Sequence, residues 1–157
     1  MRAITIRQAE TEIDLSAAKE IFREYEAWLE LDLCFQGFED ELKNLPGKYA
    51  PPAGRLYLAE TDGKIAGCIA LRPLASDIGE MKRLFVRENF RGMNIGKMLI
   101  EQLIEDAREI GYGAMRLDTF PPKMGKAVQL YESYGFREIP PYYDNPNKGV
   151  LFMELKL

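Results

Sequence analysis

A loop rich in glycine and basic residues is the part of the chain best suited to chemistry. It follows a strand-like segment at 80–86 and leads into a helix-like segment that begins at Gly96. Backbone N–H groups at a helix start lack partners, and the helix dipole adds partial positive charge there. The window 82–97 holds a single acid, Glu88, among its bases Lys82, Arg83, Arg87, Arg91 and Lys97. These features favour a small anionic ligand, with phosphate as the natural occupant, although a solvated turn that caps a helix stays open.

Two common phosphate-binding motifs do not fit this loop. A Walker A loop requires G-x-x-x-x-G-K-[ST], whereas Gly92 and Gly96 are closer together and Met98 follows Lys97. No hydroxyl is therefore placed to bind Mg²⁺. The dinucleotide pattern G-x-G-x-x-G is also absent from the loop. The sequence therefore argues against a nucleotide hydrolase.

Composition excludes several classes of protein. The chain contains no histidine, so a Ser-His-Asp or Cys-His hydrolase and a His-ligated zinc site are ruled out. Cys34 and Cys68 form no C-x-x-C pair, and we expect buried thiols in a reducing cytosol. The net charge of −4 argues against nucleic acid as the main partner. No membrane span and no secretory signal are expected, so the sequence predicts a cytoplasmic protein without membrane contact.

Hydrophobic periodicity and turn signals predict one domain over residues 1–157, with a mixed α/β sheet and helices on its faces. The expected strands, about seven, are 3–7, 55–60, 64–71, 80–86, 114–119, 136–139 and 150–156. The expected helices, about four, are 14–31 with Asp14 as N-cap, 38–45, 96–110 and 123–134. A helix joins strand 80–86 to strand 114–119, and such a crossover predicts that these two strands are parallel.

The loop sequence Arg91-Gly-Met-Asn-Ile-Gly96 resembles the signature [QR]-x-x-G-x-[GA] of the GNAT family of N-acetyltransferases. The strand before it, the opening segment 4–9 and the pattern Ala127, Leu130-Tyr131, Gly135-Phe136 follow in the family's order. The resemblance covers nearly the whole chain. It implies a GNAT domain in which strands 80–86 and 114–119 splay apart at the cofactor loop. It also implies acetyl-CoA as co-substrate and no metal.

Two residues depart from the family pattern. Asn94 stands where the family has a glycine, and Met124 stands where an asparagine is common. Asparagine tolerates a positive φ better than other residues with a side chain, so we expect the turn at Asn94 to be kept. At Met124 we expect a weaker polar contact with the cofactor.

The resemblance implies direct transfer of the acetyl group from acetyl-CoA to a primary amine in a ternary complex. Strand residues Leu84, Phe85 and Val86 would pair with the pantetheine arm through their backbone, and an N–H near Phe85 would polarise the thioester. One such donor contributes about 3 kcal/mol to catalysis. The pyrophosphate would be bound by the loop residues Arg91, Gly92, Met93, Asn94, Ile95, Gly96 and Lys97.

The resemblance also assigns two catalytic roles. Glu80 matches the family's general base, and strand alternation predicts that it shares a face with Lys82, Leu84 and Val86. Tyr131 matches the general acid that protonates the CoA thiolate. The plain alternatives are a surface carboxylate paired with Lys82 and a core tyrosine with a bonded hydroxyl.

The sequence says least about the amine acceptor. The segments that form the acceptor pocket in the family supply Trp28, Cys34, Phe35, Gln36, Tyr142, Tyr143 and Asp144. These mostly aromatic walls favour a small metabolite amine; Arg72, Lys82 and Arg83 would suit an amino acid's carboxylate, and a protein amine stays open. A homodimer is compatible with the sequence. The alternative function is a catalytically idle acyl-CoA sensor, which the presence of both Glu80 and Tyr131 disfavours.

Overall fold

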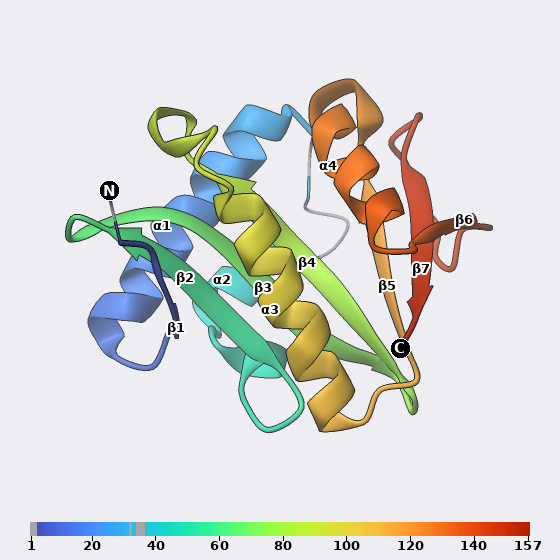
Figure 1. The fold of residues 1–157 in the computed structure, drawn as a ribbon, viewed down its shortest axis with the longest axis horizontal. Helices are drawn as coiled ribbons and strands as arrows, with labels where there is room; N and C mark the ends of the chain where they lie inside the picture. The colour runs from blue at the N-terminus through green and yellow to red at the C-terminus, as the bar shows by residue number, and fades with distance from the viewer. Residues whose placement is uncertain (1–2, 32, 34–36) are drawn as a thin grey trace.

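The computed structural model describes residues 3–31, 33 and 37–157. Its centre is a seven-stranded sheet in the order β1-β2-β3-β4-β5-β7-β6 (Figure 1). The strands are β1 (Thr5–Gln8), β2 (Arg55–Thr61), β3 (Lys64–Ala75), β4 (Ile78–Val86), β5 (Ala114–Thr119), β6 (Arg137–Ile139) and β7 (Leu151–Lys156). This is the mixed sheet that the sequence predicts. Cys34, Phe35 and Gln36, which we expected in the acceptor pocket, lie outside the described residues.

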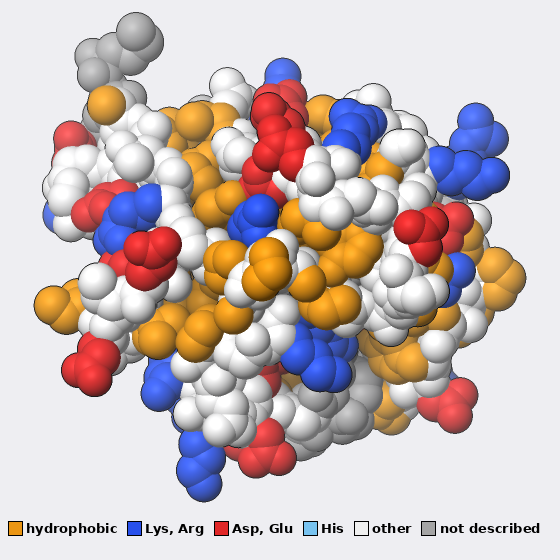
Figure 2. All heavy atoms as spheres, turned by 90° about the horizontal axis from the view of Figure 1, so that it is seen from below, with side chains coloured by type: hydrophobic (Ala, Val, Ile, Leu, Met, Phe, Trp, Pro, Cys, Tyr) orange, Lys and Arg blue, Asp and Glu red, His pale blue; other side chains and the backbone are white. Residues whose placement is uncertain are grey.

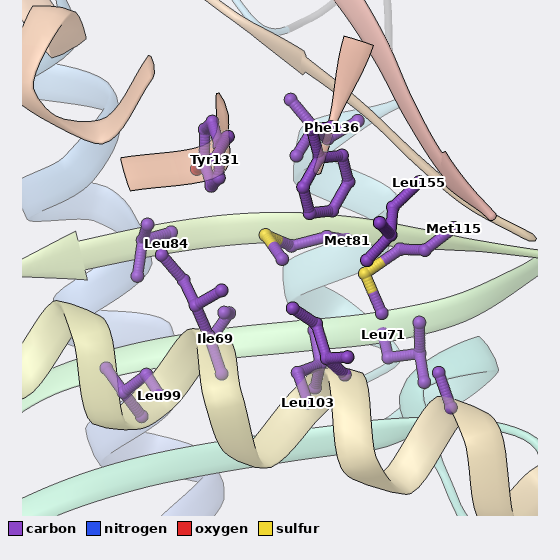
Figure 3. Packing of buried hydrophobic residues seen from close by; sticks show 14 of the residues in the cluster. Ile69, Leu71, Met81, Leu84, Leu99, Leu103, Met115, Tyr131, Phe136 and Leu155 are labelled. Atoms are coloured by element: carbon purple, nitrogen blue, oxygen red, sulfur yellow. The ribbon is translucent and has the colours of Figure 1, made fainter. Parts of the chain in front are cut away.

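Helices cover both faces of the sheet (Figure 1). They are α1 (Glu12–Leu29), α2 (Phe38–Lys43), α3 (Ile95–Ile110) and α4 (Pro121–Ser133), with short 3-10 helices η2 (Gly47–Tyr49) and η3 (Glu88–Phe90). One hydrophobic core lies between the sheet and the α3–α4 layer, and it includes Leu103, Met115 and Tyr131 (Figure 3). The other core lies between the sheet and the α1–α2 layer, around Phe22 and Leu58.

The start of α1 differs from the prediction. Thr11, not Asp14, is the N-cap: its hydroxyl accepts from the Asp14 N–H, and the Asp14 carboxylate accepts from the Thr11 N–H in return. Such a capping box satisfies N–H groups that the helix start leaves without partners. The Arg7 guanidinium donates to Asp14 at 2.6 Å and holds the pKa of this carboxyl at about 2. Asp14 therefore stabilises α1 as its third residue and ties it to β1.

Strands β4 and β5 are parallel, as predicted, but they pair over a short stretch. Residues 78–80 of β4 pair with residues 114–116 of β5, and the pairing ends there. Beyond it β5 continues to pair with β7 up to Thr119, and β4 continues to pair with β3 up to Val86. The two strands therefore splay apart toward the end of β4 at which the glycine-rich loop begins.

A bulge in β4 accompanies this separation. The β3–β4 register shifts between Cys68 and Ala70, and Arg83 has a φ of +63°. A non-glycine residue with positive φ is strained, and it changes the side-chain alternation of the strand. Met81 and Leu84 therefore point into the same core (Figure 3). The prediction that Glu80 shares a face with Leu84 and Val86 is wrong, because strict alternation ends at the bulge.

Buried contacts on the α2 side hold Arg83 in this conformation. Its guanidinium donates two hydrogen bonds of 2.9 Å to the Glu41 carboxylate and lies 5.1 Å from the centre of the Phe38 ring. The Arg83 carbonyl accepts from the Cys68 thiol at 3.1 Å. Strain of this kind persists only where the surroundings determine the conformation. Helix α2 therefore stabilises the backbone turn that separates β4 from β5.

In the described part of the chain, no helix is long and apolar enough to cross a bilayer. Acidic and basic side chains are interspersed on the face drawn in Figure 2.

The contrast between two Arg–Glu pairs on α2 gives a stability prediction. Glu41→Gln removes the carboxylate that faces the buried Arg83 and should lower the free energy of unfolding by about 3 kcal/mol, because breaking a buried ion pair leaves an uncompensated charge. Glu39→Gln is the matched control, since Glu39 forms the same two-bond pair with Arg23 at the surface. Exposed pairs contribute little, so the control should keep the urea midpoint of the unmodified chain. Equal midpoints for both variants would refute the role of Glu41.

Candidate functional site

The splayed strands enclose a pocket. Its walls come from β4, β5, the C-terminal end of α1, the start of α4 and the loop before β7. Apolar side chains outnumber polar ones in the lining, and the polar groups come from Lys82, Arg83, Asp118, Thr119, Asn145 and Asn147, a mixture that small-molecule sites use. The lining residues are Tyr25, Leu29, Leu31, Leu33, Met81, Lys82, Arg83, Leu84, Leu117, Asp118, Thr119, Phe120, Met124, Tyr131, Asn145, Asn147 and Val150.

Tyr131 reaches this pocket from α4. The side chain is 3% exposed and packs over Leu84 and Met81 of β4 (Figure 3). Its hydroxyl has no hydrogen-bond partner among the described residues, so the hydrogen-bonded core tyrosine of the plain alternative does not apply. Burial raises the pKa of Tyr131 well above that of a free phenol. The hydroxyl is therefore protonated at neutral pH and able to donate toward the pocket.

Glu80 is buried but does not line the pocket. The side chain is 1% exposed; one carboxylate oxygen accepts from Arg72 Nε at 2.8 Å and the other accepts from the Tyr142 hydroxyl at 2.6 Å. The alternative of a surface carboxylate paired with Lys82 is therefore wrong. Burial and the nearby Glu80 raise the pKa of Tyr142. Any proton that passes between Glu80 and the pocket must use Tyr142 or an intervening water.

Asp118 lines the pocket, although the sequence did not single out this residue. It is the acid among the described lining residues, and it accepts from the Tyr143 hydroxyl. Its Oδ1 lies 3.8 Å from the Lys82 Nζ, whose pKa is lowered by burial. Tyr142 and Tyr143 pack against each other and against Phe152, each with a ring separation of 5.2–5.4 Å. One aromatic loop therefore covers both carboxylates. The signal in the sequence that could have identified Asp118 is an aspartate near the end of a buried strand.

The basic residues expected near an acceptor carboxylate divide into two groups. Arg72 pairs with Glu80 and Arg83 pairs with Glu41, so both charges are offset within the chain. Lys82 does line the pocket. Of the other residues expected in the acceptor pocket, Trp28 packs against Phe85 with ring centres 5.6 Å apart, and Asp144 is exposed. Cys68 is buried and donates to a backbone carbonyl, while burial raises its thiol pKa, so it is no nucleophile.

The glycine-rich loop keeps the geometry that the sequence predicts. Asn94 is the N-cap of α3 with a φ of +61°, and Gly92 has a φ of +85°. No side chain caps the helix, and its first internal bond runs from the Met98 N–H to the Asn94 carbonyl. The N–H groups of residues 94–97 are therefore left without helical partners, as at any helix start. This concentration of donors suits an anion.

The Arg91 side chain does not extend from the loop as it would to reach a phosphate. Its Nε donates to the Val86 carbonyl at 2.9 Å, and its guanidinium lies 5.0 Å from the centre of the Trp28 ring. The side chain thus braces the loop against the end of β4 while staying exposed. Lys97 is exposed on the first turn of α3.

Met124 interrupts α4 and forms no polar contact with the loop. Its φ of −119° and ψ of 32° are not helical, and its sulfur accepts from the Thr119 hydroxyl at 3.8 Å. The described residues contain no group of acids and cysteines able to hold a metal ion, and the absence of a metal stays a prediction.

Residues 15–136 match the acetyltransferase (GNAT) family, and the chain belongs to this family. It is 38% identical over 156 residues to an uncharacterized N-acetyltransferase of Schizosaccharomyces pombe, a match that covers 98% of this chain and 95% of that protein. The protein is thus an acetyl-CoA-dependent N-acetyltransferase.

Solved structures agree in fold. A GNAT-family acetyltransferase from Staphylococcus aureus superposes with a TM-score of 0.80 at 23% identity, over 98% of this chain and 99% of that one. The PaiA N-acetyltransferase of Thermoplasma acidophilum, solved in complex with coenzyme A, has a TM-score of 0.74 at 19% identity, over 99% of each chain.

Proposed function

We propose that this enzyme acetylates the primary amine of a small metabolite, by direct attack on acetyl-CoA in a ternary complex. The observation that carries the proposal is the unpartnered Tyr131 hydroxyl in a pocket between splayed strands. The loop before β7 lines one wall of the pocket through Asn145 and Asn147, and its tyrosines bond to Glu80 and Asp118. A pocket between two strands suits a small acceptor better than an extended peptide.

Coenzyme A would lie along the gap between β4 and β5. The N–H groups of residues 94–97 suit its pyrophosphate, and the backbone of residues 84–86 has an edge that does not pair with β5. The coenzyme A bound to the Thermoplasma acidophilum relative supports this ligand. The Val86 carbonyl already accepts from Arg91, so Leu84 and Phe85 would supply most of the pairing with pantetheine.

The reaction needs one proton removed and one supplied. The amine nitrogen attacks the thioester carbon, the C–S bond breaks, and the sulfur leaves with the electron pair. Tyr131 donates its proton to that sulfur. An alkylammonium has a pKa of about 10.4, so the amine must first lose a proton at neutral pH. Glu80 takes this proton through Tyr142 or a water.

A thiol-release assay with acetyl-CoA tests the proposal. We expect release of CoA to depend on small primary amines and not on peptides of comparable concentration. A preference for peptides would reject the small acceptor. Binding of acetyl-CoA without release with any amine would instead support the idle sensor.

Gly96 tests the placement of the cofactor. A Cβ there would meet only Val86 Cγ2, at 3.9 Å, so the fold has room for a larger residue. Gly96→Leu should therefore melt normally but obstruct the pyrophosphate, with CoA affinity reduced by about tenfold or more (~1.4 kcal/mol) in calorimetry. Unchanged affinity would remove the pyrophosphate from this loop.

Tyr131→Phe tests the acid. The change keeps the ring and should lower kcat by about 10²–10⁴-fold, the usual contribution of a general acid, while the Kd of CoA and the Tm stay the same. Tyr134→Phe is the matched control on the same helix, since its hydroxyl bonds to Glu101 on the surface. A lower Tm with normal turnover in Tyr131→Phe would show a structural role only.

Glu80→Gln tests the base. We expect a kcat lower by about 10²–10⁴-fold, because an amide cannot accept the proton. Glu154→Gln is the control, because Glu154 pairs with Arg116 at the same 2.8 Å, whereas Glu80 also accepts from the Tyr142 hydroxyl. A normal kcat in Glu80→Gln would assign the base elsewhere.

A further inference from the structure

The charged groups of the pocket include both signs. Among the described lining residues, Lys82 and Arg83 carry positive charge and Asp118 carries negative charge. The Arg83 guanidinium is bonded twice to Glu41, so its charge is offset away from the pocket. The remaining charges of the pocket are one cation and one anion, separated by 3.8 Å between Lys82 Nζ and Asp118 Oδ1. A plain alkylammonium would add a second cation beside Lys82.

A buried donor in the same pocket lacks a partner. The side-chain nitrogen of Asn147 is inaccessible to solvent and makes no hydrogen bond with any residue that the structure describes. Leaving a buried N–H group unsatisfied is costly, and such groups usually have a role or a ligand. Asn147 lines the pocket, so a ligand there that presents an acceptor oxygen would complete it.

The loop before β7 fixes the position of this donor. The Asn147 backbone N–H donates to the Asn145 side-chain oxygen at 2.8 Å, and the Asn145 nitrogen donates to the Tyr143 hydroxyl at 3.0 Å. Tyr143 in turn donates to Asp118. The anion and the unpartnered donor are therefore parts of one connected network on the same wall.

We propose that the acceptor is a free α-amino acid whose carboxylate binds Lys82 and the Asn147 side-chain nitrogen, while its ammonium group faces Asp118. This assignment rests on the proposed acetyl transfer and names its substrate class. An amino acid brings one charge of each sign, so it pairs with both charged groups. Its carboxylate also supplies an acceptor for the Asn147 side-chain nitrogen. The walls beside them, including Leu29, Leu117 and Met124, are apolar and suit an uncharged side chain.

The test compares acceptors that differ only in the carboxylate. Methionine, methioninamide and 3-(methylthio)propylamine are assayed with the unmodified enzyme and acetyl-CoA, and the leucine series is assayed in the same way. We expect kcat/KM for the amino acid to exceed that for its amide and its amine by about 10²-fold or more, because a site built to hydrogen-bond a group rejects analogues that lack it. Thermal stabilisation of the CoA-bound enzyme by each compound reports binding without turnover.

Variants identify the residues. Lys82→Met and Asn147→Leu keep the approximate side-chain volume and should raise KM for methionine by about tenfold or more, with little change for methioninamide. Lys43→Met, an exposed lysine on α2, is the control and should leave both values unchanged. Circular dichroism checks the fold of each variant.

The outcomes separate the two proposals. If the amide or the amine is used as well as the amino acid, the amino-acid assignment is overturned and acetylation of small amines stands. If no small amine releases CoA although acetyl-CoA binds, the proposed function fails. In that case carboxylate-dependent thermal stabilisation supports an amino-acid site, and equal or absent stabilisation by methionine and methioninamide rejects it.

Discussion

The positive φ of Arg83 is the constraint on which the site depends. It is the point where β4 bulges away from its regular pairing with β3, just past the last pair that it forms with β5. Arginine does not favour this conformation, so the turn exists only because Glu41, Phe38 and Cys68 hold the residue from the α2 side. Helix α2 and the strand proposed to hold the cofactor are therefore one mechanical unit.

The same bulge decides which groups face one another. It places Leu84 beside Met81 in the core under α4, where Tyr131 packs, and leaves Glu80 on the other side of the strand. The proposed acid and base therefore approach the reaction centre from different faces of β4. A proton route from the proposed base Glu80 would therefore pass through the tyrosine loop, whereas Asp118, on the splayed end of β5, is the carboxylate that lines the pocket.

Local signals in the sequence predict much of the fold and part of the candidate site. The parallel β4–β5 pair and the positive φ of Asn94 follow from crossover rules and backbone preference. The rest depends on contacts between distant segments. Nothing in the residue type of Arg83 indicates a left-handed turn, and strict alternation then misassigned Leu84. The partners of Arg72 and Glu80, and the network of Asp118 with Tyr143, come from tertiary packing that a single sequence does not encode in any short pattern.

The absence of histidine gives the site its particular chemistry. Without an imidazole, no unperturbed side chain titrates near neutral pH, so the proposed acid and base functions would fall to a tyrosine and a carboxylate. Burial raises the pKa of Tyr131 and keeps it protonated, which also makes it a weak acid in the ground state. A thiolate that develops in the same buried pocket is equally disfavoured as an anion, because low polarity penalises both charges. In the proposed mechanism, proton transfer between the two would therefore be governed by their shared desolvation, and the tight packing of Tyr131 against β4 would bring the phenol and the sulfur into that common environment.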